Sequence, residues 1–200
     1  MIKEKASIMR NGFTILEILV VLAISALLTS IALSYNSASR TEVALSVEEA
    51  KISQFILQAK SLSLATYGAS GSGSGIICGY GMIFDSSAQT YGIFQYEPAR
   101  DNASVTACRD VTSSGHISSI TAAEIAPYTG GTWKVHVAQG VTMEPGGAAA
   151  ILFFPPDPTT YISADGSNFP QPTPTGYVRL RAGNGDTRTI IVNPAGQVSL

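Results

Sequence analysis

Residues 11–33 read NGFTILEILVVLAISALLTSIAL. From Phe13 to Leu33, 21 residues, the stretch carries one charged residue, Glu17. As a helix these residues would rise about 31 Å, close to the thickness of the hydrocarbon core of a bilayer. The 12 residues before Phe13 hold three basic residues and one acidic residue, a net charge of +2, and positive flanks tend to stay in the cytoplasm. The pattern predicts one membrane crossing, with the N-terminus cytoplasmic and the remainder outside.

A conventional secretory signal peptide is the alternative interpretation of this segment. Such a peptide also begins with basic residues and continues with an apolar run. The run here is longer than is usual for a signal peptide, and it carries Glu17 near its start. The small residues Ser30 and Ala32 nevertheless resemble a cleavage site, so the residues alone leave both interpretations open.

The heptapeptide at positions 11–17, Asn-Gly-Phe-Thr-Ile-Leu-Glu, resembles the processing site of type IV prepilins and pseudopilins. The resemblance implies that residues 1–12 are a leader, which prepilin peptidase cuts after Gly12 before methylating the new N-terminus at Phe13. It further implies a structural subunit, not an enzyme. The implied location is the bacterial inner membrane, as a single-pass protein. The implied partners are other pilins or pseudopilins in a filament and an inner-membrane assembly platform.

The chemistry of Glu17 fits a role in assembly. A charge at the centre of a membrane helix costs roughly 2.5–3.5 kcal/mol, and one turn from the end it costs less but still needs a partner. Cleavage after Gly12 would create an α-amine at Phe13, which Glu17 of a neighbouring subunit can meet. An ion pair in a low dielectric penalises the wrong register. We expect Glu17 to act in assembly; the alternative is a protonated, inward-facing glutamate without such a role.

The helical pattern continues beyond the apolar segment. We expect residues 13–34 to form a transmembrane and assembly helix and residues 35–67 an amphipathic stalk, with Gly68 ending the helix. Many pilins carry a proline at the position of Ser34, and its absence resembles a minor pseudopilin more than a major subunit. The apolar positions of the stalk follow steps of three, four or seven: Leu45, Ile52, Phe55, Ile56, Ala59 and Leu62.

After a Gly/Ser connector at residues 68–75, we expect a β-rich antiparallel head over residues 76–200, giving an α+β fold. Asn184-Gly185 predicts a hairpin, and residues 193–196 predict a type I turn. The chain would then close with a three-stranded meander. Ile120–Ala126 is the best candidate for a short helix. The expected strands are Ile76–Phe84, Tyr91–Glu97, Trp133–Gln139, Ala149–Phe154, Tyr177–Ala182, Thr189–Asn193 and Gln197–Leu200.

The C-terminal part of the head resembles the GspH/FimT family of minor pseudopilins and pilins. The resemblance rests on ILFFPPDPTTYISADGS at residues 151–167 and TRTIIVNPAGQVSL at residues 187–200. Val192, Gly196 and Val198 match the closing hairpin of that family. It implies a subunit of a type II secretion pseudopilus or a type IV pilus.

The two cysteines, Cys78 and Cys108, would lie outside the membrane, where disulfides form. We predict that they pair; the alternative is two buried thiols. Neither His116 nor His136 lies in a pattern typical of catalysis, and we expect no cofactor.

The weakest candidate site in the sequence is a calcium site with oxygen ligands. Asp157, Asp165 and Asn168 fall in one expected loop, but without EF-hand spacing. Ordinary turn formation by these residues is the better interpretation, and we expect no metal.

Arginines at alternate positions mark a candidate partner or anion patch. Arg179 and Arg181 would share one face of a strand, and the expected hairpin places Arg188 opposite Arg181. Acidic residues of a neighbouring subunit or DNA phosphates would suit this patch. Some FimT-like pilins serve DNA uptake through basic residues after the final glycine, but residues 197–200 contain none. The net charge of −2 also disfavours nucleic-acid binding. The other alternative to a filament subunit is a conventionally secreted or anchored β-rich binding protein.

Overall fold

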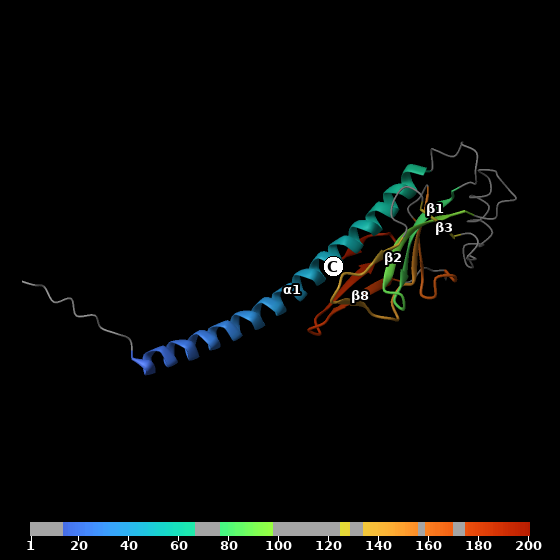
Figure 1. The fold of residues 1–200 in the computed structure, drawn as a ribbon. Coiled ribbons are helices and arrows are strands. Elements are labelled where there is room, and N and C mark those ends of the chain that lie inside the picture. The colour runs from blue at the N-terminus through green and yellow to red at the C-terminus, as the bar shows by residue number, and fades with distance from the viewer. Residues whose placement is uncertain (1–13, 67–76, 98–124, 129–133, 156–158, 170–174) are drawn as a thin grey trace, which may run out of the picture. The chain divides into compact units, whose positions relative to one another are not determined.

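The computed structural model describes residues 14–66, 77–97, 125–128, 134–155, 159–169 and 175–200 (Figure 1). Helix α1 spans Ile15–Thr66, and antiparallel strands follow it, which confirms the predicted α+β fold class. The strands are β1 (Gly79–Asp85), β2 (Thr90–Tyr96), β3 (Ile125–Pro127), β4 (Val135–His136), β5 (Val141–Met143), β6 (Ala150–Phe154), β7 (Thr159–Ser163), β8 (Gly176–Ala182), β9 (Thr187–Val192) and β10 (Val198–Ser199).

The chain divides by its internal contacts into two units, Met1–Arg40 and Thr41–Leu200. Helical residues 41–66 therefore belong to the same compact unit as the strands. The apolar face of this part of the helix forms part of the core of the head. The expected Gly/Ser connector, residues 68–75, lies outside the described residues.

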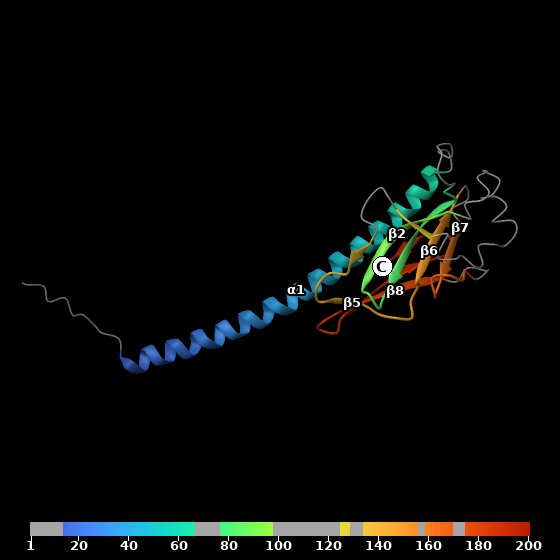
Figure 2. The same ribbon diagram turned by 45° about the vertical axis from the view of Figure 1, so that its right-hand side comes forward.

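The described strands form two antiparallel sheets (Figure 2). The larger sheet has the order β3-β2-β1-β6-β7, with β4 also paired to β2. The smaller sheet has the order β10-β9-β8-β5. The predicted three-stranded meander is thus confirmed as β8, β9 and β10, and β5 extends it on the other side.

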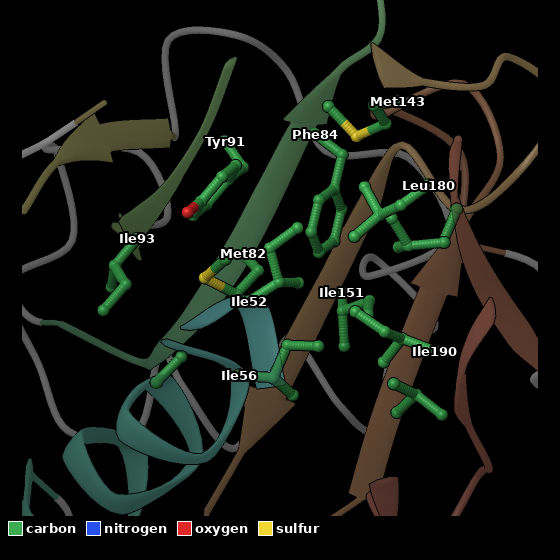
Figure 3. Close-up of a cluster of buried hydrophobic side chains, with 14 of the residues drawn as sticks. Ile52, Ile56, Met82, Phe84, Tyr91, Ile93, Met143, Ile151, Leu180 and Ile190 are labelled. Carbon is green, nitrogen blue, oxygen red and sulfur yellow. The ribbon is translucent and has the colours of Figure 1, made fainter. Parts of the chain in front are cut away.

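The main core lies where residues 41–66 of α1 meet both sheets. Figure 3 shows Ile52 and Ile56 of the helix among side chains that include Met82 of β1, Ile151 of β6 and Ile190 of β9. The predicted stripe is confirmed: Leu45, Ile52, Ile56 and Ala59 are buried, and Phe55 and Leu62 are partly buried against the same cluster. Full burial of each large aliphatic side chain contributes roughly 1.5–3 kcal/mol.

A buried carboxylate adds a polar contact to this helix–sheet packing. Glu48 is 1% exposed, and the Tyr91 hydroxyl donates to its Oε1 at 2.6 Å. Lys51 Nζ lies 3.7 Å from Glu48 Oε2 and 5.7 Å from the centre of the Tyr91 ring. Burial, together with the bond to Glu48, raises the pKa of the Tyr91 phenol, so the hydroxyl keeps its proton and remains a donor. The hydrogen bond from Tyr91 therefore gives the buried carboxylate of Glu48 a donor where α1 packs against β2.

We expect Tyr91→Phe to lower the free energy of unfolding of the full chain by about 1–3 kcal/mol, because it leaves a buried carboxylate oxygen without its donor. Chemical denaturation followed by circular dichroism measures the change. Tyr177→Phe is the matched control: the exposed Tyr177 hydroxyl donates to Gly146 O at 2.7 Å, and its loss should cost much less. Equal losses for the two variants would contradict the role given to Glu48.

Short strands account for most of the differences from the sequence-based expectations. The expected helix at Ile120–Ala126 is wrong in its described part, because Ile125–Pro127 forms β3 against β2. The sequence patterns do not predict strands β5 and β7, and the strand expected at Trp133–Gln139 is reduced to the two residues of β4. Pairing with a neighbouring strand specifies such short segments more than local propensity does.

Gln89 joins the two sheets through its side chain. Its Nε2 donates to Met143 O at 3.0 Å, and Met143 N donates to Gln89 Oε1 at 2.6 Å. The side-chain amide of Gln89 thus makes with Met143 of β5 the two hydrogen bonds that a backbone peptide group of a neighbouring strand would make. The backbone of Gln89 has a φ of 53°, a left-handed conformation that is uncommon for a residue with a side chain.

Candidate assembly site

The start of α1 is capped by its own sequence. Glu17 N donates to Thr14 O at 3.0 Å and to Thr14 Oγ1 at 3.3 Å, so Thr14 is the N-cap residue. A carboxylate in the first turn is favourable beside the positive end of the helix dipole. Glu17 is exposed and therefore accessible to a neighbouring molecule. Gly12 and Phe13 lie outside the described residues.

The first turns of α1 expose apolar side chains. Large apolar surfaces of this kind mark contact with lipid or protein. Among the residues that the structure describes, no helix is both long enough and apolar enough to cross a membrane. The large apolar side chains exposed in this part of α1 are Ile15, Leu16, Ile18, Leu19, Val20, Val21, Leu22, Ile24, Leu27, Leu28 and Ile31.

The arginines of β8 share one face and meet a carboxylate of the same chain. The burial of β8 alternates along the strand, with Arg179 and Arg181 on the exposed side, as predicted. Glu144, which follows β5, lies between them: its Oε2 is 3.6 Å from Arg179 Nη1 and its Oε1 is 3.5 Å from Arg181 Nη1. The Arg179 guanidinium also lies 5.5 Å from the centre of the Tyr177 ring. These three charged side chains together carry one net positive charge.

The expectation that Arg188 lies opposite Arg181 is wrong. Arg181 pairs with Thr187, and Arg188 pairs with Leu180. The loop has three residues instead of two: Ala182 N donates to Asp186 O at 2.8 Å, and Gly185 takes a φ of 97°. A shift of one residue moves every side chain to the other face, so Arg188 does not join the patch.

The Asp165 loop is organised by hydrogen bonds to one carboxylate. Asp165 Oδ1 accepts from Asn168 N at 2.7 Å, from Ser167 N at 2.9 Å and from Ser163 Oγ at 2.9 Å. The Asn168 side-chain amide donates to the other oxygen, Oδ2. These bonds, led by those from Asn168, lower the pKa of Asp165. Of the calcium candidates, Asp165 and Asn168 therefore bond to each other, and Asp157 lies outside the described residues.

We expect Asp165→Asn to lower stability at pH 7 and to lower it less at pH 3. Because the folded pKa is depressed, the carboxylate contributes its full stabilisation above its unfolded pKa, about 3.9, and this contribution declines as the pH falls from that value through the folded pKa. Thermal denaturation of both chains at pH 7 and pH 3 measures the difference. A deficit in the variant that is as large at pH 3 as at pH 7 would contradict this account.

The remaining predicted residues are only partly described. Cys78 is buried just before β1, whereas Cys108 lies outside the described residues, so their pairing stays a prediction. His136 is exposed on β4, and His116 is not among the described residues. Within the described part of the chain, no three His, Cys, Asp or Glu side chains are grouped so as to hold a metal ion.

Comparison with known proteins addresses the N-terminal segment directly. Residues 9–33 match a family model described as the prokaryotic N-terminal methylation motif. The match confirms the prepilin-type N-terminus predicted from residues 11–17. Proteins with this type of N-terminus are structural subunits and not enzymes.

Among solved structures, the chain is similar to the minor pseudopilin EpsH from the Type 2 Secretion System of Vibrio cholerae. The sequence identity is 9% and the TM-score 0.39, over 78% of this chain and 94% of that chain. No curated protein matches the sequence significantly.

Proposed function

We propose that this chain is a minor pseudopilin or pilin of the GspH/FimT type, assembled into a type II secretion pseudopilus or a type IV pilus. The methylation motif at residues 9–33 is the observation that carries the proposal. The apolar side chains exposed along residues 15–31 support it, since such a surface needs either lipid or neighbouring helices. In this proposal the segment is held in the inner membrane, with the head outside the cytoplasm, until assembly transfers it from lipid to protein.

Processing prepares the subunit for assembly. Prepilin peptidase cleaves after Gly12 and methylates the amine of Phe13. The exposed carboxylate of Glu17 pairs with the amine of a neighbouring subunit and sets the axial register of the filament. Thr14, the residue after Phe13 in the sequence, caps the described helix through the bonds that it accepts from Glu17 N.

The head supplies contacts with neighbours and stability outside the cytoplasm. Arg179 and Arg181 are exposed on β8 and can meet acidic residues of an adjacent subunit. Glu144 already offsets part of their charge, and Arg188 lies on the other face, so a site for DNA phosphates is not favoured. The pairing of Cys78 with Cys108 would close a loop of about 30 residues, worth roughly 3–4 kcal/mol in the chain-entropy model.

Recovery of the chain in filaments tests the proposal. The full chain, tagged at its C-terminus, is expressed in a host with a complete type II secretion or type IV pilus system, and filaments are isolated by shearing. We expect the tag in the sheared fraction at a low ratio to the major subunit, and only when prepilin peptidase is present. A chain that stays in the membrane fraction of every such host contradicts the proposal.

A further inference from the structure

A cavity lies at one end of the head, where β1, β5 and β7 end and β6 and β8 begin. Its volume is about 60 Å³, which is room for about four to six water molecules. Gly146 and Ala164 line the cavity and are exposed, so it opens to solvent. Figure 3 shows Phe84 and Met143, two of the lining side chains, at the same end of the main core.

The lining of the cavity offers both apolar surface and hydrogen-bonding groups. Its apolar part consists of the buried side chains of Phe84, Met143, Ala148 and Val178. The hydroxyl of Ser86 also lines the cavity and makes no hydrogen bond with another residue that the structure describes. Gly146 and Gly147 contribute only backbone, so a ligand can approach their peptide groups closely. A purely hydrocarbon ligand would leave such polar groups without water or a partner, which costs free energy.

The charge at the cavity favours a neutral ligand group. Among the described residues that line the cavity, only Glu144 is charged. Its carboxylate lies between the guanidinium groups of Arg179 and Arg181. An anionic group would be repelled by this carboxylate, and a cationic group would compete with two arginines that are already in place. The cavity therefore suits a neutral polar group with a small apolar part.

An acetamido group has this composition. Its methyl suits the apolar lining, and its carbonyl can accept a hydrogen bond from the Ser86 hydroxyl. Its N–H can donate to the carboxylate of Glu144, and hydrogen bonds with one ionised partner are about twice as strong as neutral ones. With one methyl, one carbonyl and one N–H, the group is also of the size of the cavity.

Hydrogen bonds hold the segments around the cavity in place. Asp85 Oδ1 accepts from Ala88 N at 2.9 Å, which holds the turn that carries Ser86. The Tyr177 hydroxyl donates to Gly146 O at 2.7 Å, which holds the loop before β6. Binding therefore has little chain to order, and the free energy lost to ordering is small.

The strand edge beside the cavity is occupied, which favours a sugar over a peptide as the carrier of the acetamido group. An extended peptide binds a sheet by adding a strand to an exposed edge. At β5 the backbone N–H and C=O of Met143 are both bonded to the side chain of Gln89. A sugar ring needs no such edge, and the partly exposed ring of Tyr177 next to Gly146 offers it an apolar surface.

We propose that the cavity binds the acetamido group of an N-acetylated amino sugar, and that the head thereby binds a glycan built from such sugars. The sugar ring lies at the mouth of the cavity, beside Tyr177. Bacterial cell walls contain glycans of this chemistry. That the head meets them rests on the proposed function, which places it outside the cytoplasm, whereas the binding itself does not.

Saturation-transfer NMR tests the site on the full chain in micelles of a detergent without a sugar headgroup. The probe is the β-1,4-linked tetrasaccharide of N-acetylglucosamine. Cellotetraose is the matched control ligand, because it has the same linkage and carries hydroxyl groups in place of the acetamido groups. We expect the acetyl methyl protons to receive the most saturation, and cellotetraose to bind at least about tenfold more weakly. Equal binding of the two tetrasaccharides, or no binding of the acetylated one, overturns the proposal.

Substitutions at the cavity test its location. Ala164→Trp places a large side chain at the mouth and should weaken binding of the acetylated tetrasaccharide at least about tenfold. Ser86→Ala removes the unpaired hydroxyl and should weaken it about three- to tenfold. Ala195→Trp is the matched control, because Ala195 is exposed in the turn before β10 and does not line the cavity. Unchanged binding by the Ser86 and Ala164 variants overturns the proposal.

A small peptide amide separates the two carriers of the acetamido group. N-acetylalanine methylamide should bind at least about tenfold more weakly than the acetylated tetrasaccharide, because it has no sugar ring to lie beside Tyr177. Equal binding would make a peptide the occupant and would overturn the proposal. Binding of a soluble sugar needs neither processing nor assembly, so its failure is distinguishable from failure of the proposed function.

Discussion

Glu17→Ala should reduce incorporation of the chain into filaments by more than about a hundredfold while leaving the head folded. Removing one partner of an ion pair in a low-dielectric environment costs roughly 3–5 kcal/mol, and each 1.4 kcal/mol is a factor of about ten. The variant also removes the carboxylate from the first turn of α1, but that loss is worth only about 0.3–1 kcal/mol. The effect should therefore appear in assembly and not in folding. Quantitative detection of the tagged chain in sheared filaments measures it.

Glu42→Ala is the control for this substitution, because Glu42 is an exposed acidic residue on the same helix. It should leave incorporation unchanged. Circular dichroism of both purified variants should match that of the parent. Normal incorporation of the Glu17 variant would show that the carboxylate has no part in assembly.

Gly196→Ala should destabilise the head by about 2–5 kcal/mol. Gly196 has a φ of 68°, and this left-handed conformation costs roughly 1–2 kcal/mol per residue that carries a side chain. A Cβ at this position would also lie 2.7 Å from Thr160 Oγ1 and 3.2 Å from Lys60 Nζ, so α1 and β7 leave no space for it. Overpacking of this kind costs typically about 1–3 kcal/mol more. Chemical denaturation of the full chain measures the sum.

The hairpin glycine provides a comparison that separates the two costs. Gly185 has a φ of 97°, but a Cβ there would have no atom within 4 Å. Gly185→Ala should therefore show only the conformational cost. Equal losses for the two variants would mean that contact with Thr160 and Lys60 does not restrict residue 196. The crowding at Gly196 arises because Lys60 Nζ donates to Gly196 O at 2.9 Å and holds the turn against α1.

Long periodic patterns in the sequence predicted the elements that carry the fold. The apolar steps from Leu45 to Leu62 identified the face of α1 that is buried, because one helical face repeats every three to four residues. The alternation in β8 identified its exposed arginines in the same way. Asn184-Gly185 located the hairpin between β8 and β9.

The differences arose where tertiary contacts overrule local sequence. The register of the β8–β9 hairpin depends on whether its loop holds two residues or three, and the same Asn-Gly pair is compatible with both. Strand β5 is short, and Gln89 from a distant turn supplies hydrogen bonds to its last residue, Met143. The burial of Glu48 could not be predicted, because the sequence does not show that Tyr91 lies opposite it. Residues 11–17 were sufficient to predict the methylation motif, whereas the carboxylate of Glu144 beside Arg179 and Arg181 required the structure.

The mass and N-terminal sequence of the mature chain, produced in a host with prepilin peptidase, test the central claim most directly. We expect a chain that begins at Phe13 and carries one N-methyl group. A chain that begins within residues 31–40 would indicate conventional secretion and would contradict the roles given to Glu17 and to the apolar segment. An intact Met1 start in the same host would equally contradict processing after Gly12.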